Sequence, residues 1–218
     1  VLNNLRWLQI NPLLVKVHYM VADSSGHMAV IEFLDGKIHV FTGDDLPVPV
    51  LSNNKYQNTL RYLRMHKGFG GDLEIRKGAG SQERFVRAAE GIKNYRPDPG
   101  KSLGRFASGL LEDLSQDDTQ WSIIYNLSCG QITYKTRFHN EAISVDFNQL
   151  DFGPSRQSLM MIMMSPQVNL EMKPGHYYEW DAYINKLLLK RVLGQMVTWG
   201  EIDEKKARTI KEKITALF

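Results

Sequence analysis

Cysteine is nearly missing from this sequence, which has only Cys129 among its 218 residues. A single cysteine forms no internal disulfide and cannot supply several thiolate ligands to zinc. This excludes a disulfide-stapled scaffold and a Cys-ligated zinc domain. Cys129 has no neighbouring histidine that could activate it, and we expect it in a tight hairpin loop. We therefore interpret it as a bystander thiol.

Long apolar runs and a strong charge imbalance are also missing. No stretch approaches the ~20 apolar residues that span a bilayer, and 27 Lys and Arg residues face 24 Asp and Glu residues. So small and dispersed an excess gives no reason to expect nucleic acid as a partner. With 43% hydrophobic and 23% charged side chains, the chain has a globular composition. We expect one domain over residues 1–218.

Phosphate-binding and metal-binding motifs are absent as well. Gly100-Lys101-Ser102 ends like a phosphate-binding loop, but Tyr95 stands where that motif needs its first glycine. The six histidines include no His-x-x-x-His pair that could hold a metal on one helix. The stretch from Gly68 to Gly80 lacks the dinucleotide-binding spacing, and we interpret it as a mobile loop near a site. The sequence thus implies no metal and no organic cofactor.

Apolar periodicity predicts strands first and helices next. Alternating apolar residues predict antiparallel strands over 15–21, 28–34 and 37–41. Asp35-Gly36 joins the last two, and this dipeptide is a strong hairpin signal. Helical spacing predicts the next three elements, a helix over 55–66 that Ser52, Asn53 or Asn54 could cap, a helix after an N-cap at Ser81, and a helix over 103–114.

The second half of the chain repeats this order. Strands over 121–127 and 131–136 flank a predicted three-residue loop, 128–130. Later elements are predicted as strands over 142–147 and 159–164, a helix over 183–199 and a final helix capped by Asp203. Strands, helices, strands and helices in succession favour the α+β class with stacked layers.

Two segments stand out in combination. Val50-Leu51-Ser52-Asn53 follows the Asp-Gly hairpin, and Ser81-Gln82-Glu83-Arg84-Phe85-Val86-Arg87 comes later. Together with the stretches 18–26, 29–33 and 119–125, they resemble the choloylglycine hydrolase family, which includes penicillin V acylases and bile salt hydrolases. The resemblance runs from about Leu2 to Phe152.

The resemblance implies a four-layer α-β-β-α fold of the N-terminal nucleophile hydrolases, which cleave linear amide C–N bonds. By motif position, Asn53 resembles the family's oxyanion-stabilising Asn, and Arg84 resembles the Arg beside its nucleophilic Cys. Each residue also has a purely structural interpretation. Asn53 could cap a helix, and Arg84 could be a surface residue in a first helical turn.

One departure from the family is large, because Val1 stands where the resemblance needs a Cys, and the family's N-terminal portion has no counterpart here. We expect the chain alone to be inactive and to need an N-terminal segment or chain that carries the nucleophilic Cys. Candidate substrates are penicillin V, conjugated bile salts or N-acyl homoserine lactones. The alternative is a non-catalytic relative that acts as a binding or assembly module.

The resemblance also carries expectations about partners and compartment. It implies a homo-oligomer, with a tetramer as in many family members, and gives no reason to expect a membrane partner. A bacterial protein is implied, and both cytoplasm and periplasm stay open as its compartment.

Overall fold

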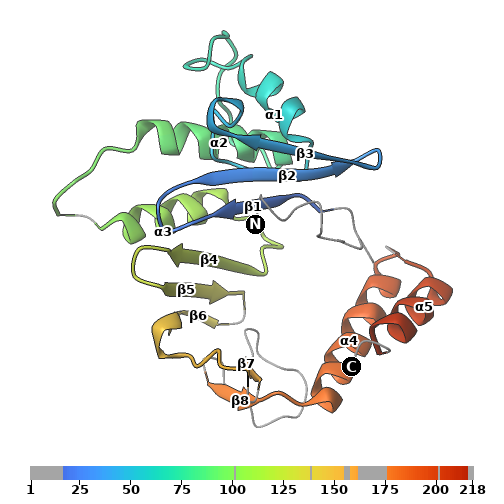
Figure 1. Ribbon diagram of the computed structural model, residues 1–218. Helices are drawn as coiled ribbons and strands as arrows, with labels where there is room; N and C mark the ends of the chain where they lie inside the picture. Colours follow the sequence, from blue (N-terminus) through green and yellow to red (C-terminus); the bar gives the residue numbers. More distant parts are fainter. Residues whose placement is uncertain are drawn as a thin grey trace. The chain divides into compact units, whose positions relative to one another are not determined.

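The computed structural model describes residues 17–100, 102–137, 139–154, 158–161, 176–200 and 202–215. These residues divide into two compact units, one within Val17–Pro154 and the other within Ser155–Met161 and Tyr177–Phe218. Figure 1 shows helices and sheets in both units, which confirms the predicted mixture of helix and sheet. The four-layer arrangement and the single domain over 1–218 stay predictions.

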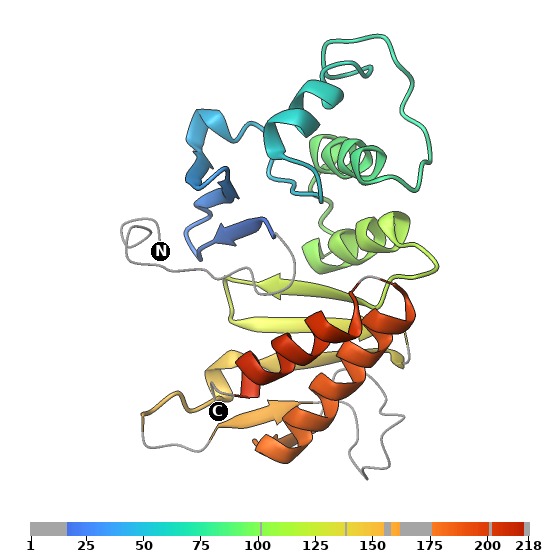
Figure 2. The same cartoon turned by 90° about the vertical axis from the view of Figure 1, so that its right-hand side faces the viewer.

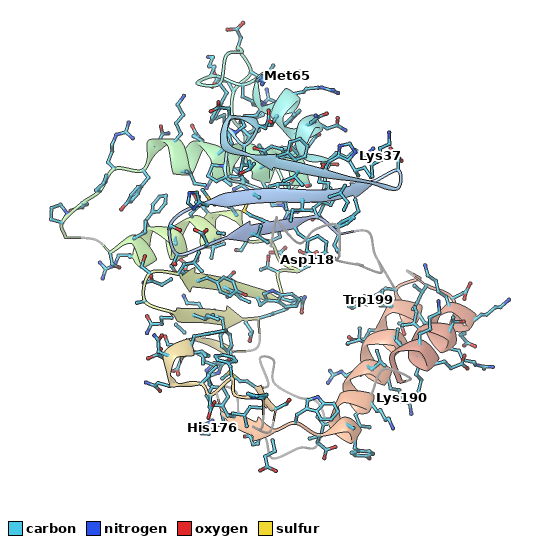
Figure 3. The ribbon with its side chains drawn as sticks, viewed as in Figure 1. Lys37, Met65, Asp118, His176, Lys190 and Trp199 are labelled. Carbon is cyan, nitrogen blue, oxygen red and sulfur yellow. The ribbon has the colours of Figure 1, made fainter. Side chains whose placement is uncertain are left out.

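The first sheet has three antiparallel strands in the order β1-β2-β3, and they run over Tyr19–Ala22, Met28–Leu34 and Lys37–Thr42. The predicted hairpin is confirmed, since Leu34 pairs with Lys37 across Asp35 and Gly36. Both turn residues have a positive φ, 52° at Asp35 and 74° at Gly36, as a two-residue turn between twisted strands requires. Lys37, labelled in Figure 3, marks the turn end of this hairpin.

The main core of the first unit lies between this sheet and two helices, α1 (Tyr56–Leu63) and α2 (Ser81–Asn94). Figures 1 and 2 both place these helices on one side of the sheet. The buried cluster joins Val30 of β2 and Phe41 of β3 to the apolar faces of both helices, which supply Tyr56, Leu63, Phe85, Val86 and Ala89. Helical spacing of these side chains had indicated this packing.

Both helix starts differ from the predicted caps. The N-cap of α1 is Lys55, which makes no side-chain capping bond, so the Ser-Asn-Asn sequence before it does not cap the helix. Ser81 is the first residue of α2 and not its cap, because Gly80 holds that position. In both places a hydrogen bond with a residue distant in sequence replaces the local side-chain cap.

The segment after α1 begins with a hydrogen-bonded turn, which forms the first part of the loop predicted over Gly68–Gly80. The N–H of Lys67 donates to the Leu73 carbonyl at 2.9 Å, and the N–H of Leu73 donates to the Met65 carbonyl at 2.9 Å. A Cβ on Gly71 would overlap the Met65 backbone. Met65, labelled in Figure 3, lies in this turn, and only glycine at position 71 allows so close an approach.

The second sheet also has three antiparallel strands, in the order β4-β5-β6. It follows α3, whose N-cap Ser102 accepts a hydrogen bond from the Arg105 N–H at 3.2 Å. The remaining elements of this unit are η2 (Gly43–Asp45), α3 (Leu103–Leu114), β4 (Trp121–Asn126), β5 (Gln131–Thr136), β6 (His139–Asp146) and η3 (Phe147–Gln149).

The β4–β5 loop has one residue more than predicted. Asn126 pairs with Gln131, so Leu127 belongs to the loop and not to the strand. Asn148 holds the loop from η3, where its Nδ2 donates to the Cys129 carbonyl at 2.8 Å. Cys129 itself is exposed.

The second unit combines a short hairpin with two helices, over β7 (Leu159–Met161), β8 (Tyr177–Glu179), α4 (Ala182–Thr198) and α5 (Glu204–Thr215). Asp203 accepts from the Lys206 N–H at 2.6 Å, as its predicted capping role requires. Leu193, Ile202 and Ile210 form the core of the helix pair, while Trp199, labelled in Figure 3, is exposed. Residues 162–164 of the predicted strand over 159–164 lie outside the described residues.

None of the helices in the described ranges is both long and apolar enough to cross a lipid bilayer.

Candidate active site

The structure brings the two predicted site residues to the same place in the first unit. Asn53 lies in the segment that leads into α1, and its N–H donates to the hydroxyl of Ser81 at 3.0 Å. Ser81 and Arg84 share the first turn of α2. The hydrogen bond therefore ties the backbone of Asn53 to the helical turn that carries Arg84.

Asn53 does not have the structural role that its sequence position allows. The first N–H of α1, on Tyr56, donates to Oε1 of Glu32 at 2.8 Å, and Lys55 at the N-cap makes no side-chain bond. The Asn53 side chain is exposed and is not the cap of α1. Its amide is therefore open to donate hydrogen bonds to another molecule.

Arg84 is half-buried, which also argues against a simple surface role. Its Nε is buried and has no hydrogen-bond partner among the described residues. Arg87, one turn further along α2, also has a buried Nε without a partner among the described residues, but its terminal nitrogens are paired. Its Nη1 donates to the Asp113 carbonyl at 2.6 Å and its Nη2 to the Gly78 carbonyl at 3.3 Å. Arg87 thus joins α2 to the end of α3, while Arg84 has hydrogen-bonding capacity left over.

Glu83 contacts both the loop before α2 and helix α1. Its side chain folds back over the preceding loop, and a Cβ on Gly78 would come within 2.6 Å of the Glu83 Cγ. The hydroxyl of Tyr62 in α1 donates to Glu83 at 3.4 Å. Burial raises the pKa of Tyr62 above its usual value, and the nearby Glu83 carboxylate raises it further. These contacts hold the first turn of α2, with Ser81 and Arg84, against α1.

A second polar atom near Asn53 also lacks a partner. The hydroxyl oxygen of Ser52 is buried and makes no hydrogen bond within the described residues. An amide, a guanidinium and a hydroxyl thus lie on two connected segments with unused hydrogen-bonding capacity. Two of these groups, Ser52 Oγ and Arg84 Nε, are buried, and buried polar groups are nearly always paired. The arrangement suits the binding of an anion or of a developing negative charge.

Sequence reasoning missed Glu32 and His18. Glu32 is only 1% exposed, and its Oε1 lies 2.5 Å from Nδ1 of His18 as well as next to the Tyr56 N–H. His18 is one of the six histidines that we had interpreted as surface or packing residues. A signal was present, since Glu32 is a charged residue inside the apolar run of β2. Buried carboxylates are rare unless they are paired.

Neither Asn53 nor Arg84 lines the cavities beside α2, α3 and β4. A cavity of about 570 Å³ lies between α2 and α3, where Tyr95, Arg96 and Phe106 contribute to its wall. Another, of about 460 Å³, lies beside β4. Within the described part of the chain, no three His, Cys, Asp or Glu side chains gather in a way that could hold a metal ion.

Comparison with solved structures shows that part of this chain has a fold similar to that of hydrolases which the sequence resembles. The penicillin V acylase from Agrobacterium tumefaciens superposes with a TM-score of 0.52 and 18% identity, over 62% of this chain and 46% of that chain. This match confirms the resemblance to choloylglycine hydrolases at the level of the fold. A single-residue variant of conjugated bile acid hydrolase from Clostridium perfringens gives 0.49 and 19%, over 62% and 51%.

The chain thus spans about half the length of these solved relatives. No protein-family model and no curated protein sequence matches it.

Proposed function

We propose that this chain is part of an acylase that hydrolyses a linear amide C–N bond. In this proposal the nucleophile is the N-terminal Cys of a segment outside these 218 residues. The hydrogen bond from the Asn53 N–H to the Ser81 hydroxyl, 3.0 Å long, is the observation that carries it, because it joins the two motifs of the resemblance. Penicillin V, conjugated bile salts and N-acyl homoserine lactones are the candidate substrates.

The proposed chemistry uses both site residues. The thiolate of the nucleophile attacks the acyl carbon, and the carbonyl oxygen becomes an oxyanion that accepts a hydrogen bond from the Asn53 side-chain amide. The guanidinium of Arg84 favours the thiolate over the thiol. The C–N bond then breaks, and the leaving amine takes the proton that the α-amino group of the Cys had accepted. Water hydrolyses the thioester, releases the acid and restores the thiol.

The unpaired polar atoms support a site that another segment completes. Both Ser52 Oγ and Arg84 Nε are buried without a partner among the described residues. Leaving such a group unpaired costs about 1–3 kcal/mol, so a segment that supplies partners would be stabilised at this place. Cys129 is a poor alternative nucleophile, because it lies in the β4–β5 loop, where its thiol contacts the Asn126 carbonyl at 3.9 Å.

Intact mass and N-terminal sequencing of the purified native protein test the proposed partner directly. A second polypeptide, or a longer chain, that begins with Cys is the expected result. The same preparation is assayed on a panel of the three substrate classes. If material of 218 residues alone hydrolyses an amide, the proposed need for a separate nucleophile is wrong.

Two arginines of α2 provide a matched test of the site in the complete enzyme. Arg84→Ala should lower kcat sharply and leave the melting temperature nearly unchanged. Arg87→Ala should lower the melting temperature, since it removes two hydrogen bonds to carbonyl groups. Asn53→Ala should lower kcat by about 10²–10³, as expected for an oxyanion donor. Full activity of Arg84→Ala and Asn53→Ala would instead favour a binding or assembly module.

We also propose a homo-oligomer, with a tetramer by resemblance. Light scattering on the native protein checks the subunit number.

A further inference from the structure

The segment that carries Asn53 is closed at its base by one residue, Tyr56. The Tyr56 hydroxyl donates to the Val48 carbonyl at 2.8 Å and accepts from the Val48 N–H at 3.4 Å. The Tyr56 side chain is 0% exposed and packs between Phe41 and Phe85. Residues 48–56 therefore form a loop whose two ends meet at a fixed aromatic ring, with Asn53 between them.

Tyr56 is in turn held by Glu32 in the centre of the first sheet. Glu32 lies on β2, which pairs with β1 on one side and β3 on the other. Its Oε1 accepts from the Tyr56 N–H at 2.8 Å and lies 2.5 Å from His18 Nδ1. Oε2 is buried with no partner among the described residues. The Glu32 carboxylate thus connects strand β2 to the start of α1, where the 48–56 loop ends, and to His18.

Local residues could have capped α1 at a lower free-energy cost. Ser52, Asn53 and Asn54 stand directly before the N-cap and are residue types that cap helices well. Burying a carboxylate costs more than using an exposed Asn, even when hydrogen bonds compensate part of the cost. Because the buried Glu32 carboxylate accepts the Tyr56 N–H, the Asn53 side chain is not used to cap α1.

We propose that Glu32 is a positioning residue for Asn53. By capping α1 from β2, it fixes the end of the 48–56 loop and leaves the Asn53 side-chain amide free of the helix, while the Ser81 hydroxyl holds the Asn53 backbone N–H. The structural part of this inference needs no activity, while its catalytic consequence rests on the proposed function. We therefore choose one measurement for each part.

Amide hydrogen exchange on the native full-length protein tests the structural part. Glu32→Leu should speed exchange of the Tyr56 N–H by about tenfold or more, because this N–H loses its hydrogen bond to the carboxylate. Glu32→Gln keeps an acceptor oxygen and should keep most of the protection. The paired β2–β3 amides are the internal reference, and Thr59→Val, which removes a buried hydroxyl from the same helix, is the control variant.

Unchanged exchange of Tyr56 in Glu32→Leu would overturn the inference. If this variant does not fold, Glu32→Thr provides the same test, since its side chain suits a strand and is too short to reach the helix. Faster exchange of the Tyr56 N–H is expected for Glu32→Thr as well, and unchanged exchange would again overturn the inference.

Steady-state kinetics of the complete enzyme with an acyl-amide substrate test the catalytic part. Glu32→Leu should lower kcat with little change in KM, because an oxyanion donor acts mainly in the transition state. Glu32→Gln should restore most of kcat, and Thr59→Val should leave it unchanged. If Asn53→Ala lowers kcat but Glu32→Leu does not, the catalytic consequence of positioning is wrong. If Asn53→Ala has no effect either, the proposed function fails while the exchange result still stands.

Discussion

The substitution Tyr56→Phe removes a single oxygen atom from the core of the first unit. The ring is fully buried, with ring centroids 5.0 Å from Phe41 and 6.2 Å from Phe85. Phenylalanine keeps these contacts and its volume. The variant loses the hydrogen bond that the hydroxyl donates to the Val48 carbonyl at 2.8 Å and the longer one, 3.4 Å, that it accepts from the Val48 N–H.

The expected loss of stability at neutral pH follows mainly from the shorter of these hydrogen bonds. A part-buried carbonyl left without its donor costs about 1–3 kcal/mol. In a protein of this size, 1 kcal/mol corresponds to about 2–4 °C in melting temperature. We therefore expect the melting temperature of Tyr56→Phe to fall by about 2–12 °C, measured by circular dichroism at about pH 8.

The pH dependence of this difference gives a second, independent expectation. Burial raises the pKa of Tyr56 above its ordinary value of 10.0, and the hydrogen bond to Val48 opposes this only in part. Below pH 10 the phenol is neutral in both folded and unfolded chains. Above it, the unfolded chain loses the proton first, so wild-type stability falls as the pH rises towards the folded-state pKa.

The variant has no phenol at position 56, so its disadvantage should shrink between about pH 8 and about pH 11. Tyr62→Phe is a suitable control, because the pKa of Tyr62 is also raised. It should weaken the alkaline loss of stability without the cost of a lost bond to Val48. A difference between wild type and Tyr56→Phe that is zero at neutral pH, or that grows with pH, would refute this reasoning.

The remaining predictions concern turns and helices. Gly71→Ala should destabilise by about 1–3 kcal/mol in urea unfolding, because its Cβ would overlap the Met65 backbone. Gly109→Ala, in α3 with open space around it, should instead stabilise by about 0.5–1 kcal/mol; equal effects would contradict both. Hydrogen bonds from Ser25 lower the pKa of Asp23, so its contribution is present above the unfolded pKa and lost as the pH falls. Asp23→Ala should therefore lose less stability than the wild type as the pH falls; an unchanged pH of acid unfolding would contradict this.

Much of the local structure could be predicted from the sequence. Strand β2 and helix α3 have the predicted bounds, and the Asp35-Gly36 turn joins β2 to β3 as expected. Apolar periodicity and turn chemistry act over a few residues, so these features depend on little else. The β4–β5 loop was one residue short in our prediction, because its length depends on strand pairing and on Asn148, further along the chain.

The candidate site shows the limit of sequence reasoning. Family resemblance identified Asn53 and Arg84, but sequence alone left each with a structural interpretation. The capping interpretation of Asn53 fails because Glu32 caps α1 from 24 residues away, and Arg84 is half-buried with a buried Nε. Neither fact follows from local propensity, since each depends on which distant segments pack against the helix starts.

The sequence by itself therefore determined where strands and helices form in the first unit and which motifs are candidates for the site. Only the tertiary structure decided what the polar residues at the helix starts do. Ser81 has the chemistry of an N-cap, yet its hydroxyl accepts from Asn53, 28 residues earlier in the chain. A hydroxyl or carboxylate bonds to the donor that folding brings nearest, and that donor need not be a neighbour in sequence.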